Sequence, residues 1–80
     1  MEPDKIRTLI EAALPGSHVT VSGDGRHFEA LVVSEAFAGK TLIQRHRMVL
    51  DAVHDRIASE ELHAISIKAK TPAEVGQAGA

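Results

Sequence analysis

The chain has no cysteine, so no disulfide bond can stabilise its fold. Its 80 residues suffice for one domain, and a domain of this size buries only about 60 to 65% of its unfolded surface. A small apolar core must therefore hold it together. The sequence also has neither a basic-apolar leader nor an apolar run of about 18 residues. We expect a cytoplasmic protein without a membrane-spanning segment.

Aromatic residues and positive charge are also scarce. Phe28 and Phe37 are the only aromatic residues, whereas proteins that bind single-stranded nucleic acids stack bases on several aromatic side chains. Nine Lys and Arg residues stand against eleven Asp and Glu residues, which gives a formal charge of -2. An autonomous nucleic-acid binder usually has a basic excess on at least one face. The composition therefore weakens the case for nucleic-acid binding.

The first part of the chain predicts a helix followed by a hairpin. Apolar residues recur at intervals of three and four over residues 4–14, and Pro15 and Gly16 end this pattern. Residues 18–34 have two extended, β-branched runs on either side of a Gly23-Asp24-Gly25 turn, as two antiparallel strands do.

The second part predicts a long helix and a third strand. Residues 41–59 place Leu42, Val49, Leu50, Val53 and Ile57 on one helical face, with Thr41 as N-cap. Residues 63–70 alternate like a strand with one buried face. Thr71-Pro72-Ala73-Glu74 resembles a helix start, and we expect one domain over 1–74 and a disordered tail over 75–80. The resulting order, αββαβ, predicts an α+β fold with helices on one face of a three-stranded sheet.

Gly39-Lys40-Thr41 follows a strand and precedes a helix, which is the order of parts in a phosphate-binding P-loop. A P-loop also needs glycine five residues before the glycine of its Gly-Lys pair, so that backbone N–H groups can approach phosphate. That position is Ser34. We therefore interpret Gly39 as the end of a turn and Thr41 as a helix cap.

The five histidines do not form a recognisable metal motif. His46 and His54 are eight positions apart, which separates them by about 80° around a helix. His46 lies among the apolar positions of the long helix, so we expect a partly buried packing residue with one hydrogen bond. His18 and His54 are expected at the surface. His27, at the end of the hairpin loop, and His63, at the start of the third strand, are more often structural than functional in such positions.

Arg45 and Arg47 flank His46 and could form a basic edge with Lys40, although a solvated helix face is the default interpretation. The sequence has no recognisable Ser-His-carboxylate arrangement, nucleophile elbow or thiol nucleophile. We therefore expect no enzymatic activity and no small-molecule substrate.

Two long segments resemble the BolA family: FEALVVSEAFAGKTLIQRHRMV and ELHAISIKAKTPAE. The GDGRHF hairpin is similar to that of its short bacterial IbaG-like branch, and the resemblance covers about residues 4–74. It implies an αββαβ fold similar to class II KH domains, with helices on one face of a three-stranded mixed sheet.

The resemblance also implies a function. BolA-like proteins are associated with monothiol glutaredoxins, with which they share a bridging 2Fe-2S cluster, and with iron homeostasis. The family's histidine at the start of the last strand falls on His63, and imidazole can ligate such clusters. The second family ligand falls on Asp24, a hard oxygen donor, and His27 could replace it if the loop bends. The partner and glutathione would supply the sulfur ligands, and we expect no cluster on this protein alone.

Two alternatives stay open. One is a KH-like nucleic-acid-binding transcriptional regulator of stress response or morphology, with weak DNA binding, because BolA-like proteins have been linked to this role too. The other is a purely structural interaction domain. The net charge, the two aromatics and the absence of a GxxG clamp favour the glutaredoxin adaptor. The residues that would contact phosphate, or a partner, are Lys40, Arg45, Arg47, Lys68 and Lys70.

Overall fold

The computed structural model describes residues 2–24, 26–54 and 64–79, with side chains described as far as Gly76. In these ranges no helix has the length and apolar character needed to cross a membrane. The elements, in chain order, are helix α1 (Pro3–Ala13), strands β1 (His18–Gly23) and β2 (Phe28–Val33), the 3-10 turn η1 (Glu35–Phe37), helix α2 (Leu42–Val53), strand β3 (Ile65–Lys70) and helix α4 (Pro72–Gly79).

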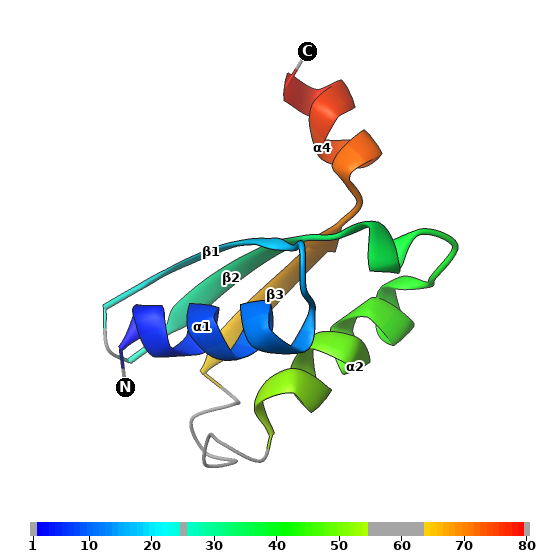
Figure 1. The fold of residues 1–80 in the computed structure, drawn as a ribbon. Coiled ribbons are helices and arrows are strands. Elements are labelled where there is room, and N and C mark those ends of the chain that lie inside the picture. The colour runs from blue at the N-terminus through cyan, green and yellow to red at the C-terminus, as the bar shows by residue number, and fades with distance from the viewer. Residues whose placement is uncertain (1, 25, 55–63, 80) are drawn as a thin grey trace.

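The three strands form one mixed sheet in the order β1-β2-β3. The β1 and β2 pair is antiparallel, and the β2 and β3 pair is parallel with Phe28 opposite Ile65. Helices α1 and α2 lie together on one face of the sheet (Figure 1), which confirms the predicted α+β architecture. The third strand is therefore an edge strand, and its starting end lies beside the hairpin loop.

The core follows from the strand period of two. Strand β2 buries Phe28, Ala30 and Val32 and exposes the intervening Glu29 and Leu31. These buried side chains pack against apolar residues of the two helices and of the other strands, and full burial of each large one contributes roughly 1.5 to 3 kcal/mol. The other members of this cluster are Ile6, Ile10, Val19, Phe37, Val49, Val53 and Ile65.

The turn into α2 has the local structure that the sequence predicts. Gly39 has φ 75°, in the left-handed region that favours glycine, and it ends the turn that follows η1. Thr41 is the N-cap of α2: its Oγ1 accepts a hydrogen bond from the N–H of Gln44 (3.1 Å), and Gln44 Oε1 accepts one from the N–H of Thr41 (2.9 Å). Gly39 and Thr41 therefore shape and start the helix.

The buried face of α2 differs from the predicted face at its first turn. Val49 and Val53 are buried as expected, but Leu42 is 75% exposed. Helical periodicity tells which side of the helix a residue occupies, but it cannot tell how far the core extends along the helix. The described part of α2 ends at Val53, and Ile57, which was predicted on the same face, lies outside the described residues.

Helix α4 occupies most of the range 75–80, for which the sequence predicts a disordered tail. Thr71 and Glu74 hold its start reciprocally: Glu74 Oε1 accepts from the N–H of Thr71 (2.7 Å), and Thr71 Oγ1 accepts from the N–H of Glu74 (3.2 Å). Figure 1 shows α4 projecting away from the sheet and from the other two helices. The helix start at residues 71–74 is therefore followed by a helix.

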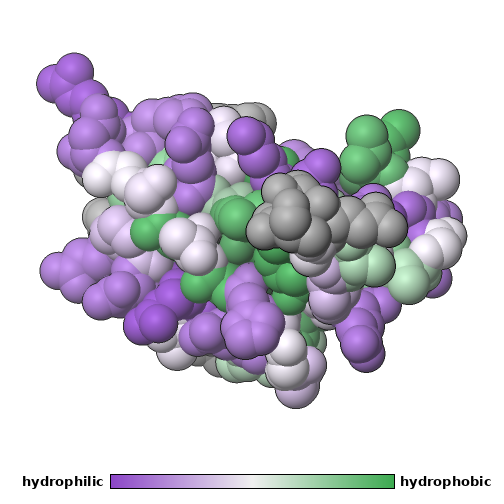
Figure 2. All heavy atoms as spheres, turned by 90° about the horizontal axis from the view of Figure 1, so that it is seen from above, coloured by the Kyte–Doolittle hydropathy of each residue, from purple (hydrophilic) through white to green (hydrophobic). Residues whose placement is uncertain are grey.

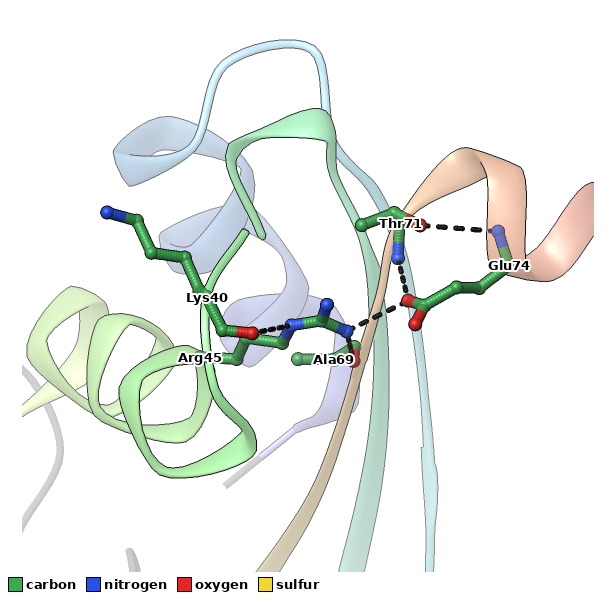
Figure 3. Close-up of polar contacts among 5 residues, drawn as sticks. All are labelled: Lys40, Arg45, Ala69, Thr71 and Glu74. Atoms are coloured by element: carbon green, nitrogen blue, oxygen red, sulfur yellow. Dashed lines mark hydrogen bonds and ion pairs between the residues drawn. The ribbon is translucent and has the colours of Figure 1, made fainter. Parts of the chain in front are cut away.

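Arg45 is buried, with 8% of its surface exposed, although it was predicted at an exposed basic edge. Its Nε donates to the carbonyl oxygen of Lys40 (3.1 Å), and its Nη1 donates to the carbonyl oxygen of Ala69 (3.2 Å) and to Glu74 Oε1 (2.8 Å). Figure 3 shows the guanidinium between these three acceptors. Arg45 thus connects α2 with the end of β3 and the start of α4, and the prediction of an exposed Arg45 is wrong.

We expect Arg45→Ala to lower the free energy of unfolding by about 2 to 4 kcal/mol, because it leaves partly buried acceptors without their donor and removes the packed side-chain stem. Urea denaturation measures the change. Glu74→Ala should cost less than Arg45→Ala, because its side chain is 45% exposed. Arg7→Ala is the control: its ion pair with Asp4 is exposed and 3.8 Å long, so its loss should cost less than about 0.5 kcal/mol. Equal effects of Arg45→Ala and Arg7→Ala would contradict the structural role of Arg45.

Candidate functional site

The hairpin loop meets the start of β3 at one end of the sheet. The N–H of Phe28 donates to the carbonyl oxygen of Ala64 (2.7 Å), and His27 Nε2 lies 3.1 Å from Ser66 Oγ, within hydrogen-bonding distance. His63 precedes Ala64 directly in the sequence but lies outside the described residues. The loop that carries Asp24 and His27 therefore lies beside the start of β3, which His63 precedes in the sequence.

Asp24 organises this loop. Its Oδ1 accepts hydrogen bonds from the backbone N–H groups of Arg26 (2.9 Å) and His27 (3.0 Å), and its own N–H donates to the carbonyl oxygen of His27 (3.2 Å). These backbone donors, that of His27 first, hold the pKa of Asp24 below its ordinary value. One carboxylate oxygen is thus already engaged in holding the turn.

His27 is exposed, and its contact with Ser66 uses only the Nε2 atom of the ring. A neutral imidazole can bind a metal through its other nitrogen while the first is hydrogen-bonded, and such a bond orients the ring. Among the residues that the structure describes, no three or more His, Cys, Asp or Glu side chains are grouped so that they could hold a metal ion. Of the loop residues, His27 is thus the softer candidate ligand, and Asp24 already has a structural contact.

The predicted basic residues divide into two groups. Lys40, Arg47, Lys68 and Lys70 are exposed, whereas Arg45 is buried in its hydrogen bonds. Lys68 and Lys70 line a hollow of ≈ 380 Å³ between α2 and β3. Arg47 lines a second hollow of ≈ 390 Å³ on the outer side of α2. Four of the five predicted cations therefore remain available to a partner.

His46 is exposed, so the prediction of a partly buried packing residue is wrong. It lies one position after the buried Arg45, which places it about 100° further around the helix. Together with Leu42 it lines both hollows. His46 therefore belongs to the surface between α2 and β3 and not to the core.

Sequence reasoning also missed two exposed apolar residues. Leu42 is 75% exposed and Ile43 is 72% exposed, and both lie in the first turn of α2. Helical periodicity could not have found this patch, because it does not tell how far the core extends along the helix. The two hollows and these side chains form what we call the α2–β3 surface: Leu42, Ile43, His46, Arg47, Leu50 and the strand segment 67–70. Figure 2 shows hydrophilic side chains over most of the upper face of the molecule, with hydrophobic ones in separate patches.

Comparison with known proteins supports the resemblance. The sequence pattern of the family described as BolA-like protein matches residues 2–74. The chain belongs to the BolA-like family. It is 40% identical over 74 residues to the acid stress protein IbaG of Escherichia coli K12, a match that covers 92% of this chain and 88% of that protein.

Two solved structures resemble this BolA-like chain. The BolA homologue from Coxiella burnetii is 39% identical in sequence, and its structure superposes with a TM-score of 0.83. The match covers 95% of this chain and 97% of the Coxiella chain. The BolA domain of SufE1 from Arabidopsis thaliana is 42% identical with a TM-score of 0.72, over 90% of this chain and 93% of that domain. In the whole Arabidopsis SufE-like protein 1, the match is 51% identical over 63 residues, 72% of this chain and 17% of that protein.

The loop contacts of Asp24 predict a pH dependence. Because its folded pKa is lowered from the ordinary value of 3.8, the stabilisation it gives is present above that pH and is lost as the pH falls through the folded pKa. Asp24→Asn keeps an acceptor oxygen but cannot titrate. Below about pH 5, where an ordinary imidazole is already protonated, we expect the amide signals of Arg26 and His27 to move on further acidification in the wild type and not in Asp24→Asn, as NMR pH titration would show. Equal acid-induced movement in both would contradict this role.

Exposure of His46 leads to a second prediction for this region. His46→Ala should change the free energy of unfolding by less than about 0.5 kcal/mol, because an exposed side chain without a buried contact contributes little. Val49→Ala, at a buried position of the same helix, should cost about 1 to 3 kcal/mol through its lost apolar contacts. Urea denaturation compares the two variants. A cost for His46→Ala similar to that of Val49→Ala would restore the packing interpretation.

Proposed function

We propose that this protein is a non-enzymatic adaptor that binds a monothiol glutaredoxin and helps to carry or sense a 2Fe-2S cluster. The observation that carries the proposal is the contact between the hairpin loop and the start of β3. Phe28 N–H bonds to Ala64, and His27 reaches Ser66, so the hairpin loop lies beside the residue that follows His63 in the sequence. The ligands of one cluster must lie close together, and this contact supports such an arrangement for the loop and His63.

In this proposal, His63 gives one imidazole ligand and His27 is the favoured loop ligand. Nitrogen ligands replace thiolates in some natural 2Fe-2S centres, and the remaining ligands would be thiolates of the glutaredoxin and of glutathione. His27 is favoured over Asp24 because it is the softer donor and because Asp24 Oδ1 already accepts two backbone hydrogen bonds. The cluster is cargo shared with the partner, because this chain has no cysteine to supply the thiolates.

An adaptor role is also supported by the way this domain occurs elsewhere. In Arabidopsis, a BolA domain forms part of a larger SufE-like protein. By analogy with that arrangement, the domain of this chain would also act through a neighbouring protein. The competing DNA-binding function loses one of its five proposed phosphate contacts, because Arg45 is buried and bound to Glu74.

The proposal predicts how histidine variants change the shared cluster. The protein would be mixed anaerobically with the monothiol glutaredoxin of its host, iron, sulfide and glutathione, and followed by visible circular dichroism. His63→Ala should abolish or strongly alter the spectrum of the mixed complex, and His27→Ala should alter it more than Asp24→Ala does, because ligand exchange changes the electronic transitions of the cluster.

His18→Ala is the matched control. His18 is exposed and opposite Val33, at the other end of the sheet from the hairpin loop, so its removal should leave the spectrum unchanged. Far-ultraviolet circular dichroism of each apo-protein separates ligand loss from unfolding. If His63→Ala gives the wild-type spectrum with its partner, the ligand assignment is wrong. If no mixed cluster forms with the wild-type protein, the adaptor function itself fails.

A further inference from the structure

The α2–β3 surface combines exposed apolar side chains with basic ones. Leu42 and Ile43 are the two most exposed large apolar residues among those that the structure describes. Leu42 and His46 line both hollows of this surface, so the two are continuous. An exposed apolar patch with a polar rim is typical of a surface that binds a partner.

The charge of this surface is of one sign. Arg47, Lys68 and Lys70 line the hollows, and no carboxylate of the described residues does. Strand alternation places the side chains of Lys68 and Lys70 on the open face of the sheet, where Lys68 also lines a hollow with Glu29, so these two long side chains would reach a partner by bending around the edge of β3. The positive charge at the hollows contrasts with the whole chain, whose acidic residues outnumber its basic ones by eleven to nine. The segregation of cations around an apolar centre favours an acidic partner, because complementary charges accelerate encounter and reject partners of the wrong charge.

The position of the aromatic residues favours a protein partner over a nucleic acid. Phe28 and Phe37 are the only aromatic residues of the chain, and both are in the core, with 3% and 0% of their surface exposed. This surface therefore has no Phe, Tyr or Trp ring on which an unpaired base could stack, and the imidazole of His46 is the only aromatic ring among its residues. Branched aliphatic side chains instead suit the burial of another aliphatic side chain.

The edge of β3 is a poor place for an added strand. The bonds from Phe28 N–H to Ala64 and from Ser34 N–H to Lys70 show that even-numbered residues of this segment bond to β2. In a parallel pair the intervening residues turn their backbone groups outward, and one of these, the carbonyl of Ala69, already accepts from Arg45. A partner bound at this surface would therefore contact side chains of α2 and β3 and would not add a strand to the sheet.

We propose that the α2–β3 surface binds an acidic segment of a partner protein, which inserts one large aliphatic side chain between Leu42 and Ile67 and places carboxylates near Arg47, Lys68 and Lys70. This site is distinct from the proposed cluster site, because Lys70 and Ala64 lie at opposite ends of β3, about 20 Å apart along a strand of this length. One partner could therefore occupy each end at the same time.

NMR titration of the isotope-labelled protein tests this proposal. The probe is a short synthetic peptide of Asp and Glu residues with one central Leu, and the matched peptide has Ser in place of Leu. We expect the Leu peptide to shift the amide signals of residues 42–47 and 67–70, and the Ser peptide to bind about tenfold more weakly because it buries no apolar side chain. A single-stranded oligonucleotide is titrated in parallel.

Two double variants locate the binding. Leu42→Ser with Ile43→Ser should weaken the Leu peptide about tenfold, and Lys68→Glu with Lys70→Glu should weaken both peptides. Lys5→Glu with Arg7→Glu is the control for charge, because these exposed residues lie on α1 and should not change peptide binding beyond a small general effect. The substituted residues are exposed, so the variants should remain folded, which their amide spectra report.

Several outcomes would overturn the proposal. Equal affinity for the Leu and Ser peptides would leave only charge attraction without an apolar site. Tighter binding of the oligonucleotide to the same amides at physiological salt would assign the surface to nucleic acid. Signal shifts that depend on protein concentration without peptide would assign it to a second copy of this chain, and shifts located elsewhere would show that the surface is not the site.

Discussion

The burial of the Arg45 guanidinium is the interaction on which the arrangement of α2, β3 and α4 depends. Taking a charged group out of water is costly unless hydrogen bonds replace the lost hydration. Lys40, Ala69 and Glu74 supply those bonds, and Glu74 also caps the start of α4 through Thr71. The Glu74 carboxylate therefore accepts hydrogen bonds both from the start of α4 and from the buried guanidinium. The bond from the Thr71 N–H and, after it, the bond from Arg45 hold the pKa of Glu74 below its ordinary range.

The inward position of Arg45 determines what α2 presents to solvent. Successive helical residues turn by about 100°, so an inward Arg45 directs His46 and Arg47 away from the core. Leu42 is exposed at the helix start for a different reason, since the core does not extend that far. A buried arginine in the helix and a helix start beyond the core together create the α2–β3 surface.

The edge strand β3 separates two chemical environments. Its first residues lie beside the loop that Asp24 holds together and that carries His27. Its last residues carry Lys68 and Lys70 and lie beside Leu42 and His46. This small domain thus has the imidazole of His27 beside one end of β3 and a basic, apolar surface beside the other end, and the sheet fixes the distance between them.

The sequence by itself determined the order of elements, the hairpin, the helix cap at Thr41 and the family, because these depend on local periodicity, turn residues and motifs. Only the tertiary structure decided that Arg45 is inside and His46 outside. A helical pattern ranks residues by side of the helix, whereas Arg45 is buried because acceptors from residues 40, 69 and 74 converge on it. The exposure of Leu42 and the proximity of His27 to Ser66 also depend on contacts between distant parts of the chain, which no local pattern contains.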